Sequence, residues 1–449
     1  MGLGDRSVYL SAFELFRIGP GPSSSATVGP QRAALRFVHD LAADGLVPAT
    51  ARVEAELYGG LAFAVREQST DRAIVAGLCG ESPERCDATS LAEGSARVEV
   101  EGTLLLGGRH RVAHIPERDL RFVVNHSVAF DGNAIRFIAR DAGGEPVASR
   151  VYYSTGNGAI LAEGDVGHEA AQRVPYPFGS AESLLHFCRI RGKKIPDIAL
   201  ANECASRSPA EVRSGLLRVA HTMLAALERG LVTYGVLPGG ALRHAPALAD
   251  AMLATPVTAE QRASIYAMAV AEENAAGGRV ASAPSNGAAG PVAALLQTWR
   301  DSGPIDAEAG TLDFLLTAAA IGQLLRAVGV KHVGCQSEVG VACAMAAAGY
   351  AAVNNGSNTQ ILYAAERALE PHLGLACDPV GGRMQDPCIG RNAKAGAHAY
   401  TAAANAIRMP DPPVGLDRMA LSAVDRGRAM AARYKVASLG GVAVNVAEC

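Results

Sequence analysis

Residues 210–230, AEVRSGLLRVAHTMLAALERG, decide the fold class because apolar residues recur in them every three or four positions. This spacing gives an α-helix one apolar face. The same period returns from residue 180 to the end of the chain, interrupted by Gly-rich breaks. We therefore expect an all-α domain over residues 180–449 whose breaks carry the chemistry. The other expected helices are SAESLLHFCRIRG (180–192), PALADAMLA (246–254), TAEQRASIYAMAVAEENAAGG (258–278), TLDFLLTAAAIGQLLRAVG (311–329), VACAMAAAGYAAV (341–353), NTQILYAAERALEPHLG (358–374) and CIGRNAKAGAHAYTAAANAIR (388–408).

Residues 1–160 mix helical and strand-like patterns, which predicts a compact α+β domain. Residues 30–45 have helical spacing and a glycine stop. Short β-rich runs between turn residues predict strands in RVEVEGTLLL (97–106), DLRFVVNHSVAF (119–130), NAIRFIARD (133–141) and RVYYSTGNGAIL (150–161). Residues 161–179 are a polar, Pro-containing linker, and Ser180 is the expected N-cap of the first helix after it.

The composition narrows the class of protein. Hydrophobic residues make up 49% of the chain, charged residues 19%, and the formal net charge is −3. Without a basic excess we expect no nucleic-acid partner, and without a long uninterrupted apolar run we expect no membrane partner. The N-terminus has no secretory pattern, so a cytoplasmic location is expected. In that compartment thiols stay reduced, and the nine cysteines are not expected to form disulfides.

Four cysteines lie outside ordinary helix faces: Cys335, Cys377, Cys388 and Cys449. Glycine or proline flanks the first three, and Cys449 is the last residue. Thiolates at the junction of a loop and a helix are stabilised by free backbone N–H groups, as iron–sulfur ligands require. Their spacing lacks the compact pairs of a zinc site or a ferredoxin, so the pattern alone leaves a metal site and buried thiols both open. The remaining cysteines are expected to be core or surface thiols: Cys79, Cys86, Cys188, Cys204 and Cys343.

Two Gly-rich segments are candidates for binding a small ligand. In IGPGPSSSATVGP (18–30), hydroxyls and backbone amides could form a nest for a carboxylate, or simply cap a helix. In EENAAGGRVASAPSNGAAGP (272–291), a packed loop with backbone donors is favoured over a flexible linker. The candidate binding residues are Ser23, Ser24, Ser25, Thr27, Asn274, Ser285, Asn286 and Gly287.

Taken together, these motifs resemble the iron–sulfur-dependent L-serine ammonia-lyases (L-serine dehydratases) in their single-chain form. The resemblance covers nearly the whole chain, and its motifs occur in the family's order. They are SAFELFRIGPGPSSSATVGP (11–30), PYPFGSAESLL (175–185), AEENAAGGRVASAPSNGAAGP (271–291), GCQSEVGVACAMAAAGYA (334–351), LGLACDPVGGRMQDPCIGRNA (373–393) and SLGGVAVNVAEC (438–449).

The resemblance implies an α+β domain, similar to the small-molecule-sensing domain of some phosphoglycerate dehydrogenases, followed by an all-helical catalytic domain. It implies a [4Fe–4S] cluster held by Cys335, Cys377 and Cys388, with Cys449 as a displaceable ligand of the fourth iron. It also implies a homodimer that converts L-serine to pyruvate and ammonia, with the cluster iron as Lewis acid and without pyridoxal phosphate.

The sequence departs from the family where histidines are usual, since Ala26, Gln68 and Asp131 stand in their places. Ser337, Gly390 and Lys394 are also atypical. Histidine is the natural base near neutral pH, so another group is expected to supply that function. The candidates are Asp131, Glu67, His126 and Lys394.

These departures leave three functions open. The first is L-serine ammonia-lyase. The second is a diverged lyase of the same fold that acts on another β-substituted amino acid, which would turn over that substrate and not serine. The third is a non-catalytic sensor that carries the cluster, which would turn over no amino acid.

Overall fold

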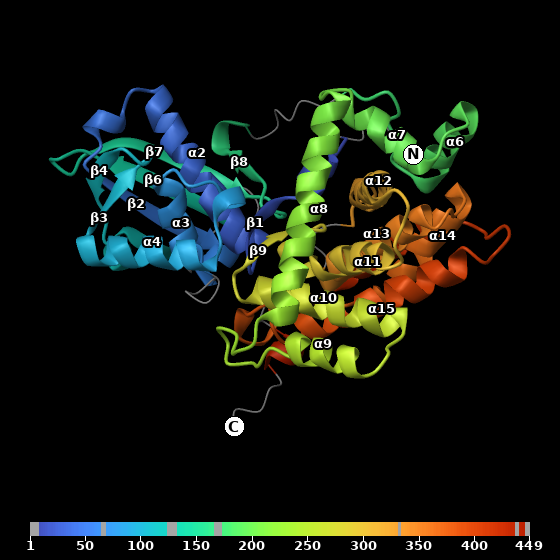
Figure 1. Ribbon diagram of the computed structural model, residues 1–449. Coiled ribbons are helices and arrows are strands. Elements are labelled where there is room, and N and C mark those ends of the chain that lie inside the picture. Colours follow the sequence, from blue (N-terminus) through green and yellow to red (C-terminus); the bar gives the residue numbers. More distant parts are fainter. Residues whose placement is uncertain are drawn as a thin grey trace. The chain divides into compact units, whose positions relative to one another are not determined.

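The computed structural model describes residues 9–63, 69–123, 133–165, 173–330, 334–435 and 440–444. The chain forms two compact units. The α/β unit comprises Ile18–Glu169 and Ala275–Arg279, and the helical unit comprises Met1–Arg17, Ala170–Asn274 and Val280–Cys449. Figure 1 colours the two units along the sequence.

The α/β unit is built on a sheet with strand order β3-β4-β2-β6-β7-β8, in which β5 also pairs with β2. Strand β2 pairs antiparallel with β6 along its whole length and parallel with β5. The strands are β2 (Arg52–Gly59), β3 (Thr103–Leu106), β4 (His110–Ala113), β5 (Leu120–Val123), β6 (Asn133–Arg140), β7 (Pro146–Ser154) and β8 (Ile160–Ala162).

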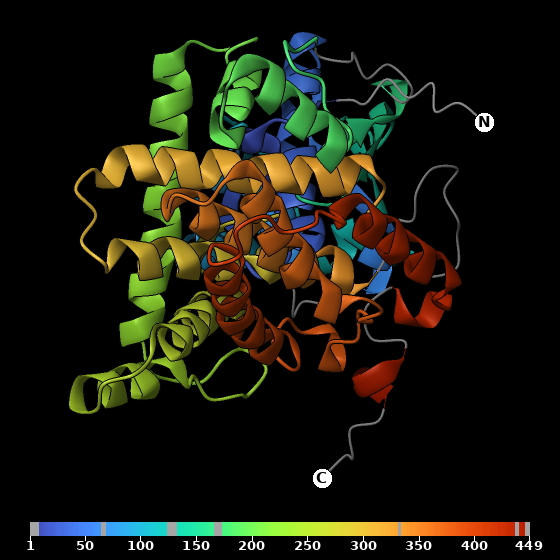
Figure 2. The same ribbon diagram turned by 90° about the vertical axis from the view of Figure 1, so that its right-hand side faces the viewer.

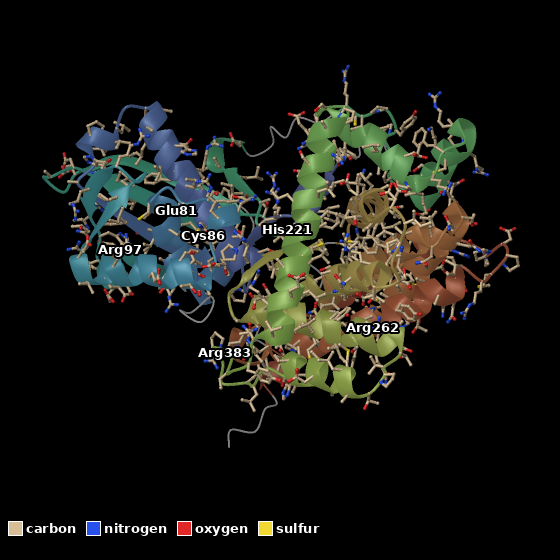
Figure 3. The ribbon with its side chains drawn as sticks, viewed as in Figure 1. Glu81, Cys86, Arg97, His221, Arg262 and Arg383 are labelled. Carbon is tan, nitrogen blue, oxygen red and sulfur yellow. The ribbon has the colours of Figure 1, made fainter. Side chains whose placement is uncertain are left out.

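Helices α2 (Gly29–Ala43), α3 (Thr70–Leu78) and α4 (Ala88–Glu101) share one hydrophobic core with this sheet. Phe37 of α2 stacks on Phe137 of β6, with ring centroids 5.1 Å apart. The side-chain amide of Gln31, on α2, donates to the Cys86 sulfur and to the Glu81 carbonyl. Figure 3 labels Cys86 and Glu81, which lie close together in this unit. Cys86 is therefore a buried core thiol, as the sequence predicts.

The helical unit contains the long helices that the sequence predicts. Figure 2 shows α8, in light green, running across α12, in light orange. The helices are α1 (Ala12–Leu15), α6 (Ala181–Arg191), α7 (Ile195–Glu203), α8 (Pro209–Val232), α9 (Ala245–Ala254), α10 (Ala259–Ala275), α11 (Gly290–Arg300), α12 (Ala307–Ala327), α13 (Val339–Val353), α14 (Asn358–Leu369), α15 (Cys388–Ala406) and α16 (Leu416–Ala429). The short strand β1 (Ile18–Pro20) belongs to the α/β unit, and β9 (Arg279–Ala281) begins in that unit and ends in the helical unit.

Helix α13 is the centre of the helical unit, because it packs against α11, α12, α14 and α15. Nearly all of its side chains are buried, and most are alanine, glycine or valine. A helix that is apolar on all sides is stable only when other helices surround it. Small side chains let these neighbours approach: a Cβ on Gly349 would lie 3.0 Å from the Phe314 carbonyl oxygen.

The first described residues are fixed in the helical unit by a buried glutamate. The Glu203 carboxylate accepts hydrogen bonds from the Tyr9 hydroxyl at 2.6 Å, the Ser11 hydroxyl at 2.7 Å and the Ala12 amide at 2.7 Å. A buried carboxylate is stable only when its oxygens are paired in this way. This contact explains why residues up to Arg17 belong to the helical unit.

The predicted fold class, an α+β domain followed by an all-α domain, is confirmed. Ser180 caps α6 by accepting from the Ser183 amide at 3.0 Å, as expected. The predicted strand at 97–106 is wrong in its first half, because residues 97–101 form the last turn of α4 before Gly102 ends it. No helix in the described ranges is long and apolar enough to cross a membrane.

Candidate functional site

Cys335 lies in the helical turn Cys335–Ser337 that leads into α13. Gly334 before it has a φ of +76°, and a Cβ on it would lie 2.4 Å from the Leu375 carbonyl oxygen. Only glycine permits both this conformation and this approach. The turn that carries Cys335 is therefore in backbone contact with the segment that leads to Cys377.

The buried Gln336 side chain fixes the same arrangement from the other side. Its carbonyl oxygen accepts from the Gly374 amide at 2.8 Å, and its NH₂ group donates to the Ala423 carbonyl of α16 at 2.9 Å. Both halves of the amide are thus satisfied in the interior. Gln336 joins the Cys335 turn, the segment before Cys377 and α16.

Cys388 is the first residue of α15, directly after Pro387, where a proline is tolerated because its missing N–H would have no helical partner. One turn later, Asn392 donates to the Cys388 carbonyl at 2.9 Å and to the Gly287 carbonyl at 2.8 Å. Its own carbonyl accepts from the Gly290 amide at 3.2 Å. Asn392 therefore binds the candidate substrate loop to the helix that begins with Cys388, a link that spacing alone did not reveal.

The three thiols Cys335, Cys377 and Cys388 influence one another. Burial raises the pKa of Cys335 to about 11 and raises the pKa of Cys377 and Cys388 further. Negative charge on Cys335 adds to the rise at Cys377, and charge on both adds to the rise at Cys388. The three predicted ligands therefore lie close together, with Cys335 buried and Cys377 and Cys388 partly exposed.

Thiols with raised pKa ionise together only when positive charge compensates them, and bound metal provides that charge. Within the described ranges, no three His, Cys, Asp or Glu side chains are grouped so that they could hold a single metal ion. An iron–sulfur cluster spreads its thiolate ligands over several irons and is held by cysteines alone. Three cysteine thiols therefore suit the ligand chemistry of such a cluster.

Arg391 on α15 adds fixed positive charge beside Cys335, whose pKa it lowers against the effect of burial. Its guanidinium also forms an ion pair with Asp378 at 2.8 Å and donates to the Ala376 carbonyl at 2.9 Å. A guanidinium stays charged even when buried. Arg391 can therefore stabilise thiolate at this place.

Glu338 is a carboxyl at the same place that the sequence-based candidates did not include. Burial raises its pKa, while the nearby Ser285 and Arg326 lower it. Charge on Glu338 raises the pKa of Cys377 and Cys388, and a Cβ on Gly287 would lie 3.3 Å from Glu338 Oε2. The sequence signal that could have identified Glu338 is its position immediately before α13, three residues after Cys335.

The candidate substrate loop is packed rather than extended. Asn286 is buried in the turn Asn286–Ala288, and Asn274 is buried near the end of α10. The Ser285 hydroxyl is shielded from solvent and interacts with the Glu338 carboxyl, whose pKa it lowers. The loop is therefore in contact with the carboxyl beside the cysteines.

In the α/β unit, the serine-rich segment forms one turn, Ser24–Val28, ahead of α2. The Ser23 hydroxyl accepts from the Ala26 amide at 3.2 Å and lies 3.3 Å from the Ser25 hydroxyl, and Ser24 and Thr27 are buried. Ala26, where the resemblance leads one to expect a histidine, is 5% exposed and belongs to the hydrophobic core of this unit.

Of the candidate bases, Lys394 is described, and its side chain is exposed on α15. Glu67, His126 and Asp131 lie outside the described residues, as do Gln68 and the fourth predicted ligand, Cys449. The cysteines expected to be ordinary thiols are buried (Cys86, Cys188, Cys343) or partly buried (Cys79, Cys204).

Comparison with known proteins matches both units to one family. The model of the serine dehydratase beta chain matches residues 11–165, and that of the alpha chain matches residues 190–443.

Curated relatives match along nearly the whole chain. An L-serine dehydratase of Streptomyces coelicolor is 40% identical over 98% of this chain and 100% of its own length. L-serine dehydratase 1 of Escherichia coli is 40% identical over 97% of this chain and 99% of its own. An L-serine dehydratase of Helicobacter pylori is 33% identical over 96% and 98%. With two matching domain models and relatives of full length, the chain belongs to the serine dehydratase family.

Proposed function

We propose that this protein is an L-serine ammonia-lyase that removes water from L-serine and yields pyruvate and ammonia. The observation that carries the proposal is the proximity of Cys335, Cys377 and Cys388: the turn of Cys335 packs on the segment before Cys377, and the three thiols influence one another's pKa. The relatives named L-serine dehydratase support the substrate, because they match almost the entire chain.

Cys335, Cys377 and Cys388 would hold a [4Fe–4S] cluster, with Cys449 as the exchangeable fourth ligand. The cluster supplies, when bound, a Lewis-acidic iron suited to a poor leaving group such as hydroxide. Arg391 favours the ionised form of the ligands, because its charge lowers the pKa of all three thiols against the effect of burial. The candidate substrate loop brings Ser285 next to Glu338, and its hydroxyl would bind a polar group of the substrate there.

Further binding residues are assigned within each unit separately. In the helical unit, Asn274, Asn286 and Gly287 accompany Ser285 in offering polar groups to an amino acid. In the α/β unit, Ser23, Ser24, Ser25 and Thr27 form a turn rich in hydroxyls and amides that suits a carboxylate.

Glu338 is the group to which we assign proton transfer. A carboxyl with a raised pKa exchanges protons closer to neutral pH than an exposed one. Its proximity to the cysteines and to Gly287 supports this assignment over the exposed Lys394. The candidates Glu67, His126 and Asp131 remain to be compared with it by substitution.

For the whole molecule, the proposal assigns catalysis to residues 180–449, a sensing role to residues 1–160 and a linking role to residues 161–179. It also includes a cytoplasmic homodimer that acts on a small amino acid. Sedimentation of the purified protein tests the dimer.

A second candidate, a diverged lyase with another substrate, is favoured by Ala26. This residue is packed in the core, so the family histidine has no direct substitute at that position. A different β-substituted amino acid could depend less on that missing group.

The test is anaerobic purification, reconstitution with iron and sulfide, and a pyruvate assay with L-serine. About four irons per chain with pyruvate formation support the serine lyase. Iron without pyruvate, followed by turnover of another β-substituted amino acid, would favour the second candidate. Bound iron without turnover of any amino acid would instead support the non-catalytic sensor.

A further inference from the structure

The chain near its C-terminus contacts two consecutive residues, Cys377 and Asp378, of the loop between α14 and α15, which we call the cysteine loop. The Cys377 amide donates to the Tyr434 carbonyl at 2.8 Å. The next residue, Asp378, accepts a hydrogen bond from the Val442 amide at 2.9 Å through its Oδ2. The contacts lie on either side of residues 436–439, so the chain is tied to the same place both before and after them.

The second contact depends on a glycine. Gly441 has a φ of +64°, and a Cβ on it would lie 2.2 Å from Asp378 Oδ2 and 2.9 Å from Asp378 Cβ. Neither the backbone conformation nor the space permits a side chain. The fit between Gly441–Val442 and Asp378 is therefore specific.

Asp378 is also linked to the thiols through Arg391. It is 4% exposed, and its Oδ1 pairs at 2.8 Å with Arg391, whose guanidinium interacts with Cys335. One carboxylate thus binds the C-terminal segment with one oxygen and the arginine beside the thiols with the other. A buried carboxylate with two such partners is held in a fixed position.

We propose that Asp378 is the anchor that positions the C-terminal tail at the cysteines. The proposal rests on the proposed function, in which Cys449 is the exchangeable ligand. The residues from Val442 to Cys449 can span at most about 25 Å. A thiol confined to that radius has an effective concentration on the order of tens of millimolar. The anchor thereby keeps Cys449 available for rebinding after each release.

The decisive variant is Gly441→Ala, because it weakens the contact with Asp378 by a change in the C-terminal segment and leaves the sequence of the cysteine loop unchanged. Asp378→Ala removes the same contact by a change in the loop. Val444→Ala is the matched control, since Val444 lies in the same segment and its side chain is 60% exposed.

The readouts are hydrogen exchange of the peptide covering residues 436–449 and the rate of Cys449 alkylation, both by mass spectrometry on the full chain, without iron and after reconstitution. We expect Gly441→Ala and Asp378→Ala to accelerate both by about tenfold or more, as the loss of a hydrogen bond to a charged group predicts. Gly441→Ala should retain wild-type iron content, and its cluster should be lost faster in air. Val444→Ala should match the wild type.

Unchanged exchange and alkylation in Gly441→Ala would overturn the proposal, even if Asp378→Ala lost its iron, because Asp378 would then act on the cysteine loop alone. A failure of the proposed function would give a different set of results. In that case the wild type would bind no iron or form no pyruvate, while tail protection would still depend on Gly441 and Asp378.

Discussion

At the scale of single residues, the chemistry of the site depends on groups that a spacing pattern does not reveal. The glycine and proline around Cys335, Cys377 and Cys388 set these cysteines apart from helix faces, but their prediction as ligands came from the family resemblance. Glu338 was missed because a lone carboxylate before a helix is usually a solvated cap. Its raised pKa comes from burial in the folded chain, which no local pattern contains.

Glu338→Gln should lower kcat by a factor of roughly 100 or more, the usual contribution of a positioned acid or base. Because burial raises its pKa, Glu338 becomes the ionised base only at higher pH than an exposed glutamate. The kcat/KM of the wild type should therefore rise with pH through that pKa, and the variant should lack this limb. The exposed Glu260→Gln is the control, and a Glu338→Gln variant that keeps the limb would rule out the assignment.

Ala26→His, which restores the family residue, should destabilise the protein by about 1–3 kcal/mol, because it inserts a large side chain into a packed core. Ala26→Ser, which adds a single oxygen, should cost less. Urea unfolding measures both. Undiminished stability of the Ala26→His variant, together with raised serine turnover, would show that the core accommodates the histidine.

At the scale of elements, the helical period predicts where long helices lie but not how they touch. Stretches such as 210–230 and 311–329 are helices as predicted, whereas α7, α11 and α16 were missed. Residues 97–101 alternate like a strand yet continue α4, because the capping box at Asp87 starts a helix that runs on to Gly102. The close approach of two helices depends on tertiary packing, which no local pattern contains.

Two glycine-to-alanine changes within helices should have opposite signs. Alanine normally stabilises a helix interior by about 0.5–1 kcal/mol. Gly94→Ala in α4 should do so, since a Cβ there meets nothing within 4 Å. In α8, a Cβ on Gly230 would lie 2.2 Å from the Ala269 carbonyl of α10, so Gly230→Ala should destabilise by roughly 2 kcal/mol or more. Thermal unfolding compares them, and equal shifts would contradict this packing.

At the scale of the whole molecule, stability should depend on pH through a buried histidine. Burial, together with the charge of the His398 ring 6.2 Å away, lowers the pKa of His372 from 6.5 to about 4. The stabilisation is therefore complete above pH 6.5 and is lost as the pH falls towards 4, because the unfolded chain takes up the proton first.

Between pH 7 and pH 5 this histidine should cost about 2 kcal/mol of unfolding free energy. His372→Gln should remove that part of the loss, while the partly exposed His398→Gln should change it little. Urea unfolding at the two pH values measures the difference. Equal losses in the wild type and His372→Gln would place the pH dependence elsewhere.

The central claim is that three cysteines from separate segments of the helical unit hold one iron–sulfur cluster. The most direct test measures iron and sulfide per chain after anaerobic reconstitution of the wild type, of Cys335→Ser, Cys377→Ser and Cys388→Ser, and of Cys343→Ser. Cys343 is the matched control, since it is buried in α13 and bonds to the Ala395 carbonyl at 3.3 Å. We expect about four irons per chain in the wild type and in Cys343→Ser, and loss of the cluster in the three ligand variants. Full iron content in any of those three would contradict it.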